Sequence, residues 1–249
     1  MSVRAVIFDL GNTLIDCSIT SWKDFMVEGL GRTYSRLAEI VPNPPDFELF
    51  RAEAETSIAD RPFIPQSIPF EKRLQDALSA VGVGLDSDGL EELAEAFFQP
   101  VEASLSVAPD VVVVLEEFRS RGCRMAIVSN TPWGSNARIW RGALDRFGLT
   151  GYFDAIAFSA EVGWRKPSRE IFEWVLERLQ MAPENCVFVG DSPKEDIAGA
   201  LNVGMRTVFK RTPRWANEPP RGVAAIGRLV ELLELLDGGR LPSLGTRRR

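Results

Sequence analysis

The fold of this 249-residue chain is decided by the segment Arg4-Ala5-Val6-Ile7-Phe8-Asp9-Leu10-Gly11-Asn12-Thr13-Leu14. Its first part, residues 5–8, is a short and continuous apolar run, which is typical of a buried strand in a parallel sheet. The run ends at the carboxylate of Asp9, and Gly11 and Asn12 then favour a turn. Open α/β sheets keep their active sites at the carboxyl ends of their strands, so Asp9 is a candidate functional residue. Taken alone, Asp9 would fit the role of a turn cap equally well.

The composition is that of an ordinary globular protein, with 45% hydrophobic and 26% charged residues. The length allows one large domain, or one domain with an insertion. A net charge of −6 argues against general nucleic-acid binding. No stretch approaches the ~20 apolar residues that cross a membrane, so no membrane partner is expected. Because a strand starts near residue 4 and the three cysteines are scattered, we expect a cytoplasmic protein without a secretory signal.

The chain contains no histidine, and this absence narrows the chemistry. It excludes a Ser-His-Asp or Cys-His catalytic centre, a histidine general base and histidine-ligated zinc. The chemistry that remains uses carboxylates, hydroxyls, lysine and a hard cation that prefers oxygen ligands.

Strands and helices alternate regularly from about residue 107 onward. Short apolar runs predict strands at 125–128, 155–158, 187–189 and 206–209. Apolar residues at helical spacing predict helices at 110–121, 136–147, 168–179, 193–203 and 229–236. Such alternation requires right-handed crossovers and a parallel sheet with helices on both faces. The sequence therefore predicts an α/β fold, a doubly wound parallel sheet with a Rossmann-like core.

The segment before this region is different, because it shows helical stretches and no strand-like runs. The pattern predicts helices at 22–40, 47–58, 70–81 and 90–105, which prolines separate. An all-helical block after the first strand indicates an insertion that lies over the sheet edge where Asp9 is found. We therefore predict a catalytic core of residues 1–16 and 107–249, with an inserted all-helical cap domain of residues 17–106.

Two later segments place polar side chains near the ends of predicted elements. Ser129 and Asn130 follow the strand at 125–128, and Lys166 precedes Pro167, which suits the first position of a helix. A lysine beside the positive end of a helix dipole is more favourable when an anion lies between them. Taken alone, Ser129 fits a turn or helix cap and Lys166 fits a solvated side chain.

The last such segment is Val189-Gly190-Asp191-Ser192-Pro193-Lys194-Glu195-Asp196. Asp191 follows a strand, and Asp196 lies one turn inside the predicted helix, from where its side chain can face Asp191. These carboxylates, converging beside Asp9, would repel one another unless a cation bound them. A helix cap would explain Asp191 alone and a solvated face Asp196 alone. The segments together indicate a nucleophile, a bound cation and an anion clamp.

The same segments resemble the four motifs of the haloacid dehalogenase superfamily: Asp9 with Thr13, Ser129-Asn130, Lys166-Pro167, and Gly190-Asp191 with Asp196. The resemblance covers residues 3 to about 237, and the helical insertion is similar to one of the family's cap types. The spacing Gly-Asp-x-x-x-x-Asp favours the magnesium-dependent phosphatase branch. The resemblance therefore implies a phosphohydrolase that acts on a small phosphorylated metabolite.

By this resemblance, Asp9 would attack phosphorus and form an aspartyl-phosphate, an established covalent route for carboxylates. Mg²⁺ would be held by Asp9, by the backbone carbonyl of Gly11 and by Asp191. Asp196 would orient these ligands.

The resemblance also implies an anion clamp for the transferring phosphoryl group. Ser129 and Lys166 would bind its oxygens and stabilise their charge. The backbone amides of Leu10 and Asn130 are candidate further donors. Substrate specificity would then depend on the cap, whose sequence does not indicate a particular substrate. The sequence does not indicate an oligomeric state either.

Gly11 departs from the usual family pattern, Asp-x-Asp-Gly-Thr. The second aspartate of that pattern protonates the leaving oxygen and later activates water, and such help is worth ~10² to 10⁴-fold in rate. We therefore expect slow hydrolysis of alkyl phosphates and a smaller loss with aryl, acyl or anomeric phosphates. Asp16, Asp24 and Glu28 are candidate replacement acids from the cap side, although each fits the role of a solvated or hinge residue better.

Gly11 also keeps two other hypotheses open. The 2-haloacid dehalogenases of this superfamily lack the second aspartate too, attack carbon and need no metal, although Asp191 and Asp196 weigh against that activity here. A catalytically weak phosphate-binding or interaction module is the third hypothesis. Trp133 and Trp164 flank the candidate site, and we expect them to anchor loops to the core rather than to stack on a leaving group.

Overall fold

The computed structural model describes residues 3–59, 64–212 and 218–239. Within these residues a six-stranded parallel sheet has the order β5-β4-β1-β6-β7-β8. Its strands are β1 (Ala5–Phe8), β4 (Arg124–Ser129), β5 (Ala155–Phe158), β6 (Cys186–Gly190), β7 (Arg206–Lys210) and β8 (Ala224–Ile226). The strand that comes first in the sequence therefore lies inside the sheet, between β4 and β6.

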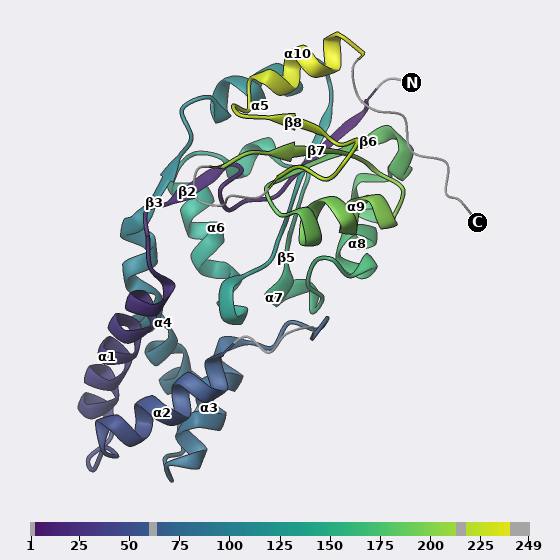
Figure 1. Ribbon diagram of the computed structural model, residues 1–249. Coiled ribbons are helices and arrows are strands. Elements are labelled where there is room, and N and C mark those ends of the chain that lie inside the picture. The colour runs from purple at the N-terminus through teal and green to yellow at the C-terminus, as the bar shows by residue number, and fades with distance from the viewer. Residues whose placement is uncertain (1–2, 60–63, 213–217, 240–249) are drawn as a thin grey trace.

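Helices cover both faces of this sheet (Figure 1). They are α5 (Val111–Ser120), α6 (Ala137–Arg146), α7 (Ser159–Val162), α8 (Arg169–Leu179), α9 (Ala198–Asn202) and α10 (Glu231–Asp237). In β1, Val6 and Phe8 belong to a buried cluster with α5 and α10, whereas Ala5 and Ile7 belong to one with α8 and α9. Because both faces are covered, the strand is continuously apolar instead of alternating.

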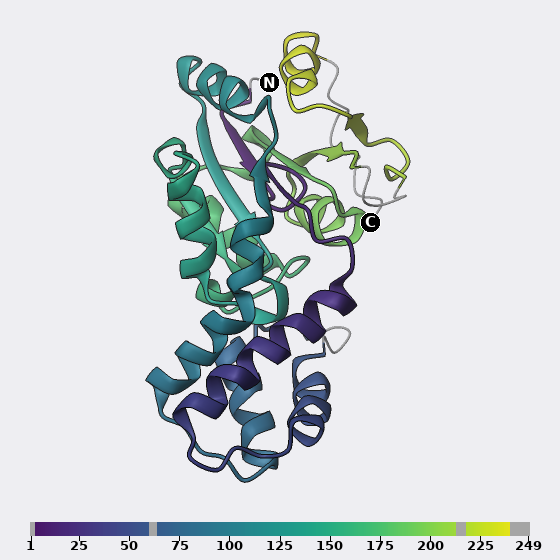
Figure 2. The same ribbon diagram turned by 90° about the vertical axis from the view of Figure 1, so that its left-hand side faces the viewer.

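The described residues of the insertion form four helices, which we call the cap: α1 (Trp22–Ile40), α2 (Phe47–Ile58), α3 (Phe70–Ala80) and α4 (Ser87–Ser104). Figures 1 and 2 both show them beyond one edge of the sheet, at the opposite end of the molecule from α10. The chain enters the cap through β2 (Ile15–Cys17) and leaves it through β3 (Leu105–Val107). These two strands pair with each other in antiparallel orientation.

The fold class predicted from the sequence is confirmed, but β2, β3 and β8 were not predicted. Each has three residues, which is too short for a periodicity to show. The pairing of β2 with β3 also joins segments that lie far apart in the sequence. No helix in the described part of the chain is long and apolar enough to span a membrane.

Near Asp191 one predicted helix differs in type, and near Lys166 one predicted helix start is wrong. The helix predicted over 193–203 begins as a π-helical turn, η4 (Pro193–Ile197), because the Ala198 N–H reaches back to the carbonyl of Pro193. Pro167 does not occupy the first helical position, since α8 begins at Arg169 with Ser168 as its N-cap residue. Lys166 therefore lies in the loop before α8.

Candidate active site

The register of the three central strands brings the predicted residues to one edge of the sheet. Phe8, the last residue of β1, pairs with residues of both β4 and β6. The next residue, Asp9, donates its backbone N–H to the carbonyl of Val189 at 2.9 Å. Ser129 ends β4 and Asp191 follows β6 directly. Three distant segments therefore meet where the sequence predicted.

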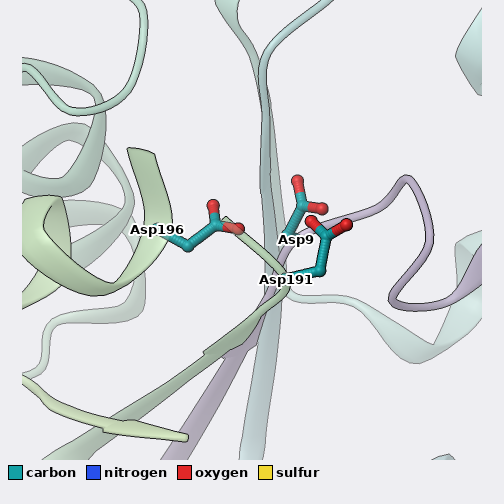
Figure 3. Close-up of side chains that lie close together, drawn as sticks. All are labelled: Asp9, Asp191 and Asp196. Atoms are coloured by element: carbon teal, nitrogen blue, oxygen red, sulfur yellow. The ribbon is translucent and has the colours of Figure 1, made fainter. Parts of the chain in front are cut away.

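Three buried carboxylates converge at this edge, as Figure 3 shows. Oxygen atoms of Asp9, Asp191 and Asp196 all lie within 4.8 Å of one another. Asp196 comes from η4, and its Oδ2 accepts the backbone N–H of Ser192 at 2.9 Å. A Cβ atom at Gly190 would lie 2.4 Å from that same oxygen, so the glycine is needed for this approach.

Lys166 lies between two of the carboxylates, and its side chain is 2% exposed. Its Nζ donates to Oδ1 of Asp9 at 2.5 Å and to Oδ1 of Asp196 at 2.7 Å. The third carboxylate, Asp191, accepts the side-chain amide of Asn12 at 3.2 Å. Asn12 has a left-handed backbone, with φ of 55°, which asparagine tolerates better than most residues.

Burial makes this cluster of charges unfavourable without a further cation. Burial raises the pKa of Asp9 to about 8, although Lys166 opposes the shift. Burial, followed by the charge of Asp196, raises the pKa of Asp191 to about 7. The pKa of Lys166 lies above its usual value because Asp196 and Asp9 outweigh the effect of its burial. If all three carboxyl groups were ionised, one ammonium group would leave an excess of negative charge.

The donor set fits a hard divalent cation. Carboxylate and carbonyl oxygens are the ligands that Mg²⁺ prefers. Among the described residues, the cluster consists of aspartates and includes neither histidine nor cysteine. A divalent cation would also favour the ionised forms of Asp9 and Asp191, whose pKa values burial raises. Gly11, whose carbonyl the sequence predicted as a ligand, lines the same cavity.

The side chain of Asn130 joins two of the loops around the site. Its Oδ1 accepts the backbone N–H of Lys166 at 2.8 Å, and its Nδ2 donates to the carbonyl of the same residue at 3.1 Å. Nδ2 also donates to Glu195 at 3.1 Å. The sequence predicted only the backbone amide of Asn130 as a donor. The structure gives its side chain the additional role of holding the loop that carries Lys166.

A cavity of about 340 Å³ opens over the cluster. Besides the three aspartates it is lined by Leu10, Gly11, Asn12, Ser129, Asn130, Pro132, Trp140, Lys166, Ser192 and Glu195. All predicted site residues therefore share one cavity. The predicted replacement acids do not line it: Asp16, Asp24 and Glu28 are exposed side chains, and Glu28 pairs with Arg32.

Glu195 and Trp140 line the cavity, and the sequence assigned no role to either. Glu195 lies in the run Lys194-Glu195-Asp196, which is also what a solvated helix face looks like. Trp140 lies in α6, where apolar spacing alone indicates a packing role. The contact between Glu195 and Asn130 crosses 65 positions of sequence, and no local pattern reports such a contact.

Known proteins match this chain over most of its length. A family model described as haloacid dehalogenase-like hydrolase matches residues 3–204. A glyceraldehyde 3-phosphate phosphatase from Methanothermobacter thermautotrophicus is 30% identical over 83% of this chain and 85% of its own length.

Two solved structures are similar over nearly the whole chain. A HAD phosphatase from Thermococcus onnurineus has a TM-score of 0.64 and 26% identity, covering 96% of this chain and 99% of its own. A 2-haloacid dehalogenase from Pseudomonas syringae pv. Tomato has a TM-score of 0.66 and 25% identity, covering 95% of this chain and 99% of its own. The overall fold is therefore shared by a phosphatase and a dehalogenase.

Proposed function

Because the chain belongs to the haloacid dehalogenase-like hydrolase family, we propose that this hydrolase is a magnesium-dependent phosphohydrolase of a small phosphorylated metabolite. The observation that carries the proposal is the cluster of three buried carboxylates beside the ammonium group of Lys166. Attack on carbon does not need a cation, whereas phosphoryl transfer gains from one. The phosphatase relative, with 30% identity, supports the same activity.

In this proposal Asp9 is the nucleophile. Its carboxylate oxygen attacks phosphorus, and the ester bond between phosphorus and the leaving oxygen breaks. Water then cleaves the aspartyl-phosphate, which releases inorganic phosphate and restores Asp9. Ser129 and Lys166 stabilise the phosphoryl oxygens, with the backbone amides of Leu10 and Asn130 as further donors.

Asp9, Asp191 and the carbonyl of Gly11 would hold Mg²⁺, and Asp196 would orient these ligands. When bound, the ion supplies positive charge to the phosphoryl oxygens and keeps the carboxylates ionised. Residues 1–16 and 107–249 serve as the catalytic core in this proposal, and residues 17–106 serve as a cap that admits substrate and excludes water.

The proposal is tested by release of p-nitrophenol from its phosphate ester, with Mg²⁺, with chelator and in two variants. This leaving group needs little protonation, so the assay does not depend on the acid that Gly11 lacks. We expect turnover that chelator abolishes and that Asp9→Asn and Asp191→Asn both abolish. Activity that persists with chelator and in Asp191→Asn would contradict the metal-dependent mechanism.

A 2-haloacid dehalogenase is the second candidate, favoured by Gly11 and by the dehalogenase structure with a TM-score of 0.66. In that activity Asp9 would attack carbon and displace halide. Chloride release from 2-chloropropionate that survives chelator and Asp191→Asn, but is lost in Asp9→Asn, would establish this candidate. Absence of both activities across a broad panel would favour a phosphate-binding module.

A further inference from the structure

Trp133 belongs to the core in sequence but packs inside the cap. It lies in η1 (Pro132–Gly134), the turn that follows β4 and Ser129. Its ring is surrounded by four aromatic side chains of α1 and α4, which we call the aromatic socket: Trp22, Phe25, Phe97 and Phe98. The stack on Phe25 is nearly parallel, with 5.5 Å between ring centroids and 6° between planes. The loop that follows Ser129 is therefore anchored in the cap, and not in the core as the sequence predicted.

The backbone of this turn is shaped for that contact. Trp133 has φ of 51°, and Gly134 has φ of 76°. A positive φ is uncommon for a bulky side chain, so the packing in the aromatic socket must hold it. A Cβ atom at Gly134 would lie 1.8 Å from the carbonyl oxygen of Ile68 in the cap. Cap and core thus touch here backbone to backbone, with no room for a side chain.

A second connection reaches the loop that carries Lys166. Cap residues 65–67 pair with core residues 163–165 through two backbone hydrogen bonds of 2.8 and 2.9 Å, around an antiparallel bridge between Gln66 and Trp164. Lys166 is the next residue after this pair. The loops that carry Asn130 and Lys166 are therefore both fastened to the cap, whereas Asp9 and Asp191 follow strands that take no part in either connection.

We infer that Trp133 is a positioning residue, whose docking in the aromatic socket places Ser129 and Asn130 for phosphoryl binding. The inference rests on the proposed function and deepens it. Phosphate binding then depends on a docked cap, while binding of the divalent cation, at the ends of β1 and β6, does not. Loss of docking is expected to lower the affinity for phosphate and to leave the affinity for the cation unchanged. Loss of overall stability would lower both affinities together.

The test measures binding of inorganic phosphate at saturating Mg²⁺, and binding of Mg²⁺ alone, by calorimetry, beside p-nitrophenyl phosphate turnover. In Trp133→Ala we expect phosphate affinity and kcat/KM to fall about tenfold or more, with Mg²⁺ affinity unchanged. Trp133→Phe, which keeps an aromatic ring in the socket, is expected to restore most of the loss. The matched control is Phe47→Ala, which removes a half-buried cap ring that packs on Tyr34 at 5.0 Å, outside the aromatic socket.

Three outcomes would overturn the inference: unchanged phosphate affinity in Trp133→Ala, an equal loss of Mg²⁺ affinity, or the same loss in Phe47→Ala. If Trp133→Ala fails to fold, Gly134→Ala tests the same contact, because its added methyl group would clash with the cap backbone at Ile68. It should give the same separation of affinities. A wild-type protein that neither binds phosphate nor turns over the ester would overturn the proposed function as well. An active wild-type protein whose phosphate affinity is unchanged in Trp133→Ala and Gly134→Ala would overturn the inference alone.

Discussion

At the scale of single residues, Gly11 is the position where this chain differs most from the pattern it resembles. A Cβ atom at Gly11 would meet nothing within 4 Å, and the backbone there does not adopt a left-handed φ. The position therefore has room for a Cβ atom, and it borders the cavity over the carboxylates. Space and backbone do not explain why glycine is present.

We predict that Gly11→Asp increases hydrolysis of alkyl phosphates by on the order of 10² or more, because it adds a general acid for the leaving oxygen. The gain with p-nitrophenyl phosphate should be much smaller, since its leaving group needs little protonation. Steady-state kcat/KM for both ester types measures this. Gly11→Asn, which has the same shape but no acidic proton, is the control, and an equal gain in that variant would contradict the explanation.

The residues at the strand ends could be predicted from sequence because each follows an apolar run directly. Asp9, Ser129 and Asp191 needed only the rule that parallel strands share one carboxyl edge. Glu195 could not be predicted, because it reaches the cavity through the π-helical turn that the sequence presents as an ordinary helix start. The side-chain role of Asn130 could not be predicted either, because it depends on contacts with loops that are distant in the sequence.

At the scale of elements, the junction of β6 and η4 holds the carboxylate cluster together. Asp196 lies against Gly190, so any side chain at that glycine must displace the carboxylate. We predict that Gly190→Ala lowers the free energy of unfolding by about 1–3 kcal/mol through overpacking, and also weakens Mg²⁺ binding. Denaturant unfolding and calorimetry measure the two effects.

The matched control for this prediction is Gly142→Ala in α6, where a Cβ atom would meet nothing within 4 Å. Alanine there should raise stability by up to ~1 kcal/mol, because it favours the helix, and should leave Mg²⁺ affinity unchanged. A Gly190→Ala protein that binds Mg²⁺ as tightly as the wild type would show that Asp196 need not lie where the structure places it.

Helices could be predicted better than the short strands. The predicted bounds of α1 and α2 agree with the structure at both ends, because amphipathic patterns specify both helices and prolines follow α1 and flank α2. The strands β2, β3 and β8 have no such pattern. Their formation depends on partners brought close by the rest of the fold, and strand propensity depends on that context.

At the scale of the whole molecule, the charges in the site couple folding to pH and to the metal. Burial raises the pKa of Asp9 to about 8 and of Asp191 to about 7, above their usual value of 3.8. At pH values between the unfolded pKa and the raised native pKa of each group, the native state therefore binds more protons than the unfolded state. Its stability falls as the pH rises through this range.

We predict that in chelator the midpoint temperature of thermal unfolding decreases as the pH is raised from about 5 to about 8. Mg²⁺ should make this decrease smaller, because it binds the native state. Differential scanning calorimetry at fixed ionic strength measures both slopes. Asp191→Asn removes one titrating carboxyl and should flatten the dependence in chelator. A midpoint that rises over this range in chelator would contradict the sign of these pKa shifts.

The pairing of β2 with β3 has a consequence for how such proteins change over evolution. Cys17 lies opposite Leu105, so the chain leaves the core and returns to it at neighbouring points. The whole helical insertion is thus topologically a single surface loop, and the length of a loop adds only slowly to the entropy of closing it. One insertion can be exchanged for another without a change in the order or pairing of the strands in the sheet. The strands that place Asp9 and Asp191 can then stay unchanged, whereas a new insertion must again dock the loops that carry Asn130 and Lys166.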